Sequence, residues 1–112
     1  MEIGAVLRVI DFLRQETQNV TMLQAGMLLA VMDRPGITQP ALGKFFRTTQ
    51  ATVSRNVHKL AKATVQDPET GTYVDAGLDF IVLKTDAEDP RAIACHLSPK
   101  GEHLRDRILR LR

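Results

Sequence analysis

Cysteine and aromatic residues are scarce in this chain of 112 residues, which contains one Cys, no Trp, one Tyr and four Phe. With Cys95 as its single cysteine the chain cannot form an internal disulfide, which is typical of proteins from a reducing compartment. A core must therefore be built from Leu, Val, Ile, Ala and Met, as in many small helical domains. The length suits one domain, so we expect residues 1–112 to fold as a single unit.

Long apolar runs are missing as well. The longest uncharged apolar run, residues 27–32, is far shorter than the roughly 20 residues that cross a membrane. The acidic residues Glu2 and Asp11 flank the first apolar stretch, unlike the basic start of a signal peptide. These absences predict a cytoplasmic protein that makes no contact with membranes.

Motifs of catalysis and of metal binding are absent. The sequence has no Ser or Cys nucleophile motif, no glycine-rich phosphate loop and no paired carboxylates. Its three histidines and Cys95 lack the spacing of metal ligands. We therefore expect no enzymatic activity, no metal and no cofactor. Cys95 falls on the inward-facing side of a predicted strand, which indicates a small core residue, with redox sensing as the alternative.

Acidic residues are missing from one long segment. Residues 34–66 contain six basic side chains and no Asp or Glu, whereas residues 67–89 contain seven acids and only Lys84 in opposition. Such segregation predicts one face directed at a polyanion and an acidic segment turned away from it. The alternative is chance clustering of charges on solvated surfaces.

Hydrophobic periodicity predicts two helices in the first third of the chain and a pair of short helices after them. The first is amphipathic and covers residues 3–17, and Thr21 is the expected N-cap of an almost wholly apolar second helix that ends at residues 33–36. Thr38 caps the third helix, which has Pro40 in its first turn and an expected buried face of Leu42, Phe45 and Phe46.

Thr48 or Thr49 caps the fourth helix, over residues 49–62, which carries a stripe of Val53, Val57 and Leu60. We expect this stripe to pack against Leu42 and Phe45. Two short helices joined by a tight polar turn form a helix-turn-helix unit, whose second helix can lie in the major groove of DNA.

The last third of the chain predicts β-structure followed by a helix. Residues 64–66 and 72–74 can pair as a small hairpin around the turn at residues 67–71. Residues 80–84 and 92–97 predict a β-ribbon, and Ser98 and Pro99 open a final helix. The expected fold is mainly α: a winged helix-turn-helix with about five helices and a two-stranded β-ribbon wing.

Three blocks of this sequence resemble the MarR family of bacterial and archaeal transcription regulators, over roughly residues 20–112. They are GITQPALG at residues 36–43, ATVSRNVHKL at residues 51–60, and DPRA followed by HLSPKG within residues 89–101. Two features depart from the family pattern: an insertion over residues 63–77 before the wing, and short terminal helices. The resemblance implies a homodimer, and it implies that Asp89 orients Arg91 at the tip of the wing.

The fourth helix offers the side chains that DNA recognition needs. Gln50 can pair with adenine and Arg55 with guanine, while Thr52 and Ser54 can contact phosphate or bases. Lys44, Arg47, Lys59 and Lys62 are suited to phosphates, and the helix N-termini at Thr38 and Thr49 also favour a phosphate. The alternative is an ordinary solvated helix face.

Arg91, in the wing at residues 85–91, is the second candidate for DNA contact, because wing arginines enter the minor groove. The alternative is a loop salt bridge of little weight, and the neighbouring Asp86 and Glu88 would repel phosphate.

Apolar stripes on the terminal helices, over residues 3–17 and 98–112, exceed what one small core uses. They predict homodimerisation through Leu7, Ile10, Leu104, Ile108 and Leu111, with packing within one chain as the alternative.

The leading hypothesis is thus a sequence-specific DNA-binding transcription regulator, a homodimeric repressor. One alternative is a winged-helix module that binds another protein through the acidic segment at residues 67–89. Another is a DNA-binding accessory factor for replication or partition.

Overall fold

The computed structural model describes residues 1–111, with the exception of the side chains of residues 63–65 and 74–76. Over this range the elements follow one another as α1 (Ile3–Glu16), α2 (Met22–Asp33), β1 (Ile37–Thr38), α3 (Gln39–Phe46), α4 (Gln50–Leu60), β2 (Ala63–Gln66), β3 (Tyr73–Ala76), β4 (Ile81–Thr85), β5 (Ile93–Leu97) and α5 (Pro99–Leu109). The winged helix-turn-helix architecture predicted from the sequence is confirmed.

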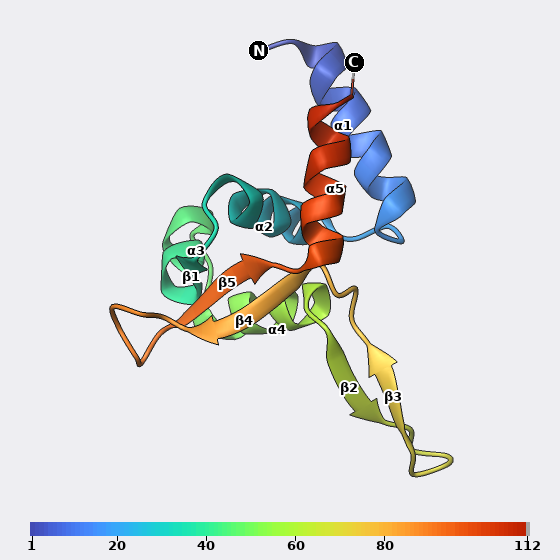
Figure 1. Ribbon diagram of the computed structural model, residues 1–112, viewed down its shortest axis with the longest axis vertical. Helices are drawn as coiled ribbons and strands as arrows, with labels where there is room; N and C mark the ends of the chain where they lie inside the picture. The colour runs from blue at the N-terminus through green and yellow to red at the C-terminus, as the bar shows by residue number, and fades with distance from the viewer. Residues whose placement is uncertain (112) are drawn as a thin grey trace.

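The molecule has two ends (Figure 1). Helices α1 and α5 run side by side at one end, and α2, α3 and α4 surround the antiparallel sheet at the other. An ion pair of 2.9 Å joins Arg107 Nη2 on α5 to Glu16 Oε1 on α1, and the Arg107 guanidinium lies 4.8 Å from the centre of the Phe12 ring. Of the helices over residues 1–111, none is long and apolar enough to cross a membrane.

The sheet has one strand more than the expected ribbon. Its order is β1-β5-β4, and Ile37 and Leu83 both pair with Cys95, from opposite sides. The two-residue strand β1 escapes sequence analysis because its signal is a tertiary pairing with β5. The side chain of Cys95, on the central strand β5, is fully buried, which confirms it as a core residue.

Side-chain caps fix the helix starts, as the sequence predicts. The hydroxyl oxygens of Thr21, Thr38, Thr49 and Ser98 each accept a hydrogen bond from the backbone N–H three residues later, over 3.0 to 3.2 Å. Each such cap contributes about 1 kcal/mol. The boundaries of the helix-turn-helix are therefore encoded locally.

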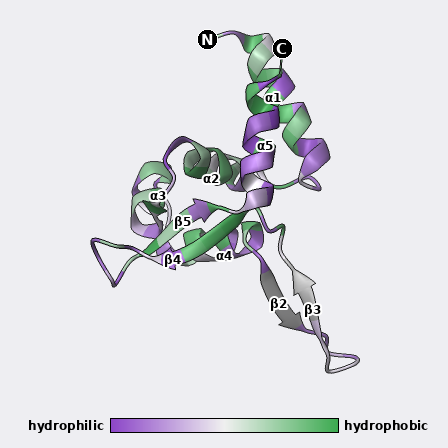
Figure 2. Ribbon diagram, in the orientation of Figure 1, coloured by the Kyte–Doolittle hydropathy of each residue, from purple (hydrophilic) through white to green (hydrophobic). Residues whose placement is uncertain are grey.

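The core lies between α2, α4 and the sheet. Met27, Leu28 and Val31 on α2 and the stripe of α4 are fully buried. Figure 2 shows that hydrophobic residues predominate along β4, whereas α5 is mainly hydrophilic. The expected contribution of Phe45 is wrong, because its side chain is 71% exposed. The inward side of α3 is instead formed by Gln39, Leu42 and Gly43, and Phe45 lies edge-on to the Phe46 ring with centroids 4.8 Å apart.

The segment between α4 and the wing forms the hairpin that the sequence predicts. Strands β2 and β3 pair with each other and lie outside the three-stranded sheet. The hairpin projects away from the helices (Figure 1). Its two ends meet at the end of α4, where Leu78 N donates to Lys59 O at 3.0 Å and Phe80 N donates to Leu60 O at 2.8 Å.

Candidate nucleic-acid interface

The turn between α3 and α4 takes three residues. Arg47 adopts the left-handed conformation, with φ of 53°, and ends α3, while Thr48 N donates to Gly43 O at 3.0 Å. Left-handed backbone at a residue other than glycine costs free energy, so the packing of the two helices must hold it in place. The turn directs the N-terminus of α4 into solvent.

Helix α4 separates an apolar side from a polar one, as expected from its sequence. Val53, Val57 and Leu60 are fully buried, and Gln50, Arg55 and Lys59 are exposed. On the exposed side, Thr49 Oγ1 donates to Thr52 Oγ1 at 3.0 Å, and Arg55 Nη2 lies 3.4 Å from the same oxygen. Ser54 is half-buried, and its carbonyl accepts a hydrogen bond of 2.6 Å from His58 Nδ1.

The six basic residues between positions 34 and 66 are all exposed. Among the side chains that the structure describes, only Arg34 of these six lies within 4.0 Å of a carboxylate, that of Asp33. Lys44 and Arg47 at the end of α3 and Lys59 at the end of α4 therefore present their charge to solvent. Thr38, by contrast, is half-buried and its hydroxyl oxygen is occupied by the Ala41 N–H.

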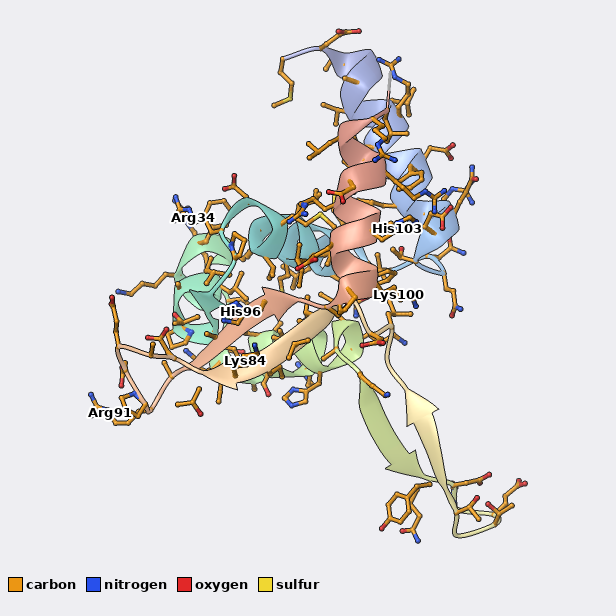
Figure 3. The ribbon with its side chains drawn as sticks, in the orientation of Figure 1. Arg34, Lys84, Arg91, His96, Lys100 and His103 are labelled. Atoms are coloured by element: carbon orange, nitrogen blue, oxygen red, sulfur yellow. The ribbon has the colours of Figure 1, made fainter. Side chains whose placement is uncertain are left out.

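The wing places Arg91 at its tip, with the side chain 93% exposed (Figure 3). Its Nε lies 3.4 Å from Asp89 Oδ1, so the contact implied by the family resemblance is present. Asp89 Oδ1 also accepts from Arg91 N, and Asp86 Oδ2 accepts from Asp89 N, each at 3.1 Å. These acids are engaged in shaping the loop.

The predicted dimerisation residues divide into two groups. Leu7 and Ile10 on α1 are 64% and 50% exposed, and Ile108 and Leu111 are partly buried. Leu104 requires a correction, since it is 3% exposed and belongs to the core. Sequence periodicity identifies the apolar side of α5. It does not show that the first half of this helix packs into the core of its own chain.

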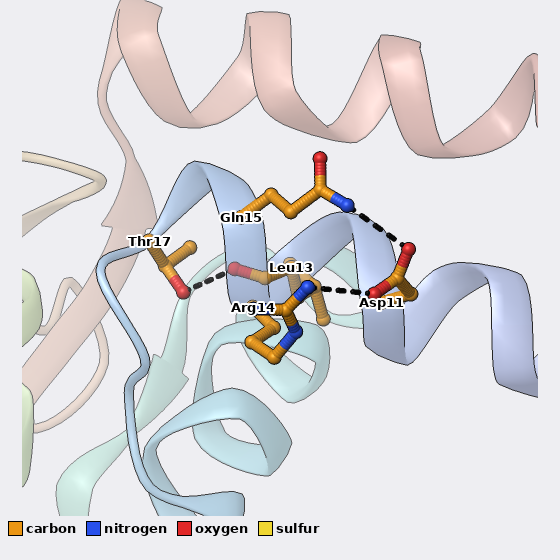
Figure 4. Close-up of polar contacts among 5 residues, drawn as sticks. All are labelled: Asp11, Leu13, Arg14, Gln15 and Thr17. Carbon is orange, nitrogen blue, oxygen red and sulfur yellow. Dashed lines mark hydrogen bonds and ion pairs between the residues drawn. The ribbon is translucent and has the colours of Figure 1, made fainter.

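An apolar groove of about 730 Å³ runs between α1 and α2. Its walls include Val6, Val9 and Ile10 from α1 and Ala25 and Leu29 from α2. Arg14 lies at the rim, where its Nη2 contacts Asp11 Oδ1 at 3.0 Å and Gln15 Nε2 donates to the other oxygen of Asp11 (Figure 4). The charge at the rim is thereby neutralised, and the groove remains an apolar surface.

One polar contact on the inner side of α4 was not predicted. Gln24 on α2 donates from Nε2 to Asn56 Oδ1 over 3.0 Å, and both residues are partly buried. The two positions are 32 residues apart, so no local pattern reveals the pair. The one sign of this contact in the sequence is the amide of Asn56 next to the apolar stripe of α4.

No group of three or more His, Cys, Asp or Glu residues within the described part of the chain is arranged to hold a metal ion. Desolvation by burial raises the pKa of Cys95 to about 11. A thiol of this kind stays protonated at neutral pH, which makes it a poor nucleophile.

The fold, the exposed second helix and the wing define a winged helix-turn-helix protein. Residues 18–63 match the family model described as MarR family. A crystal structure of MarR is 26% identical, with a TM-score of 0.59, covering 97% of this chain and 74% of that one. The chain is therefore similar to the MarR family over residues 18–63, a family of transcription regulators and not of enzymes, and it shares the winged helix-turn-helix fold of MarR.

Other solved structures share the fold at lower identity. A MarR transcriptional regulator from Methanosarcina mazei Go1 is 17% identical with a TM-score of 0.62, and the match covers 92% of this chain and 62% of that one. The S. aureus MepR–DNA complex is 22% identical with a TM-score of 0.62, covering 93% and 73%. The chain thus spans less than two thirds of the Methanosarcina regulator. No curated protein matches the chain significantly in sequence.

Proposed function

We propose that this chain is a cytoplasmic, sequence-specific DNA-binding transcription regulator that acts as a homodimeric repressor. The observation that carries the proposal is the exposed side of α4, on which Gln50, Arg55 and Lys59 stand over a fully buried apolar stripe. A side chain set of this kind suits the major groove, and the wing at residues 85–91 suits the adjacent minor groove. The fold shared with MepR in its DNA complex supports this orientation.

Each side chain has an expected role on DNA. Gln50 and Arg55 read base edges, and a good bidentate pair contributes about 1–3 kcal/mol of discrimination against a wrong base. Thr52 and Ser54 contact phosphate or bases. Lys44, Lys59 and the helix N-termini at Thr38 and Thr49 contact phosphates, and Arg91 enters the minor groove.

Two copies related by a two-fold axis would place their recognition helices in successive major grooves, about 34–36 Å apart. Such a dimer would occupy a pseudo-palindromic promoter site and exclude the polymerase. We expect the exposed apolar residues of α1, with Ile108 and Leu111, to form the dimer contact. A reporter gene fused to the bound promoter would respond to a regulator and not to an accessory factor for replication or partition.

Fluorescence anisotropy on genomic and random DNA across a salt series tests the proposal. Arg55→Ala and Gln50→Ala should change which sequence is preferred. Lys59→Ala should weaken binding to all sequences alike and reduce the slope of log affinity against log salt by about 1. Arg110→Ala, at the far end of α5, is the matched control and should change neither property. Affinity for every sequence no tighter than non-specific binding, with a Kd of about 10⁻⁴–10⁻⁶ M, would contradict the proposal.

A second candidate function, binding of a basic protein partner through the acidic segment at residues 67–89, is favoured by the hairpin that projects from the body. Its tip carries Asp67 and Glu69, and Asp67 Oδ1 accepts from Glu69 N at 2.9 Å. Binding of an oligolysine peptide that is lost in Asp67→Asn with Glu69→Gln would support this candidate. Equal binding by that variant would exclude the tip as its site.

A further inference from the structure

We propose that Gln24 and Asn56 are positioning residues that set the rotation of α4 about its own axis. They would thereby determine which base edges Gln50 and Arg55 reach. This inference rests on the proposed function, because it concerns how the same helix reads DNA.

The contact is one link in a directed chain of hydrogen bonds. Thr21 N donates to Gln24 Oε1 at 3.0 Å, Gln24 Nε2 donates to Asn56 Oδ1 at 3.0 Å, and Asn56 Nδ2 donates to Thr52 O at 2.8 Å. Each amide uses its oxygen as an acceptor and its nitrogen as a donor. Flipping either amide would place a donor opposite a donor and an acceptor opposite an acceptor. This series of hydrogen bonds therefore has only one arrangement.

The rest of the contact between α2 and α4 has no comparable directionality. Met27, Leu28 and Val31 face the stripe of α4 across an apolar core. Dispersion contacts tolerate small rotations of one helix against another, whereas a hydrogen bond weakens steeply when its angle or distance changes. The Gln24–Asn56 bond is therefore the contact that specifies the rotation.

Small rotations matter at the DNA surface. A helix with its side chains is about 10–12 Å in diameter, so a rotation of about 15° moves a side-chain tip by roughly 1.5 Å. A displacement of that size breaks a hydrogen bond to a base edge. Thr52 connects the two sides of the helix, since its carbonyl accepts from Asn56 and its hydroxyl lies 3.4 Å from Arg55 Nη2.

Asn56 is also a costly residue for this position. Asparagine is a weaker helix former than leucine or alanine. Its partly buried amide would lose further stability if it had no partner. The hydrogen bonds to Gln24 and Thr52 offset this loss, and a leucine in the same space would be expected to stabilise the helix while releasing its rotation.

The test compares sequence discrimination, defined as the ratio of Kd for a site with one altered base pair to Kd for the preferred site. Asn56→Leu should reduce this ratio about tenfold, which corresponds to the loss of one bidentate base contact. The affinity for non-specific DNA and the slope of log affinity against log salt should stay unchanged. The reciprocal swap, Gln24→Asn with Asn56→Gln, keeps the summed length of the two side chains and should restore most of the ratio. Gln15→Leu, which removes an exposed amide from α1, is the control.

Asn56→Asp provides a second variant if the leucine variant does not fold. Its carboxylate still accepts from Gln24 but faces the Thr52 carbonyl, so the ratio should again fall while circular dichroism shows a folded chain. The inference is overturned if the wild-type ratio is above ten and Asn56→Leu, or a folded Asn56→Asp, keeps the same ratio. The proposed function would then remain intact. A wild-type ratio near one overturns both.

Discussion

Gly101 lies against the carbonyl oxygen of Phe80 at the start of α5. A Cβ at this position would be 2.0 Å from that oxygen, and the clash is with backbone. Ser98 fixes the same backbone segment in place. Its N–H donates to Phe80 O at 3.0 Å, and its hydroxyl donates to Asp79 O at 2.6 Å. The junction between wing and last helix therefore requires a glycine for space.

Gly101→Ala should lower the free energy of unfolding by about 2–3 kcal/mol, because the helix must shift to relieve the clash. Urea denaturation followed by circular dichroism measures it. Gly4→Ala is the control: its Cβ would meet the flexible end of Arg8 at 3.3 Å, so better helix propensity should stabilise the chain by up to about 1 kcal/mol. A Gly101→Ala variant as stable as the wild type would contradict the packing described.

Cys95 should be unreactive in the folded chain. Because burial raises its pKa to about 11, its thiolate fraction at pH 8 falls about a hundredfold below that of an exposed thiol, and access is blocked as well. The folded state holds its proton more tightly than the unfolded state, so this group's contribution to stability is full below about pH 9 and is lost as pH rises toward 11. Ellman's reagent in buffer and in concentrated urea measures the difference. Equal rates would instead favour redox sensing.

Local signals were sufficient to predict most elements. Caps such as Thr21 and Ser98 act over three residues, and the stripe of α4 repeats every helical turn, so both are visible in the sequence. Strand β1 and the exposure of Phe45 depend on the packing of distant elements, which no window of sequence contains. The same reasoning applies to α4. Its exposed side could be predicted because the pattern is local, whereas the contact of its inner side with Gln24 depends on a distant helix and could not be predicted.

Removing the β2–β3 hairpin should leave the domain intact. Its two ends meet at Lys59 and Leu60, and its strands pair with no other strand, so a short turn in place of residues 64–75 should lower the melting temperature by less than about 4 °C. DNA affinity should stay equal or rise slightly, because the acidic residues Asp67 and Glu69 are removed. Differential scanning calorimetry and anisotropy measure the two effects. A large loss of specific affinity would show that the hairpin takes part in binding.

Across the whole molecule, the basic side chains of α3 and α4 and the exposed apolar residues of α1 lie at different ends. Lys44, Arg47, Arg55 and Lys59 lie on or beside α3 and α4, whereas α1, which runs beside α5 at the other end (Figure 1), exposes Ile3, Leu7 and Ile10. Large contiguous apolar patches are rare on monomers. This polarity suits a dimer in which one end of each copy holds its partner and the other is free for DNA.

Leu7→Asp should shift the chain from dimer to monomer at micromolar concentration, because it places a charge in the apolar contact. Sedimentation equilibrium measures the mass. Tyr73→Asp on the hairpin, which also replaces an exposed apolar side chain, should leave the mass unchanged. The monomeric variant should bind a half-site as the wild type does and lose the additional affinity for the full site. A monomeric wild type would contradict the dimer.

The left-handed Arg47 places stability and binding in competition at one residue. Glycine would adopt this backbone conformation without the cost of about 1 kcal/mol that arginine incurs, but it would remove a cation from the surface proposed to meet phosphate. A laboratory selection for thermal resistance alone should therefore favour glycine at position 47, and a selection for promoter occupancy should keep arginine. The residue found there records which pressure has been stronger.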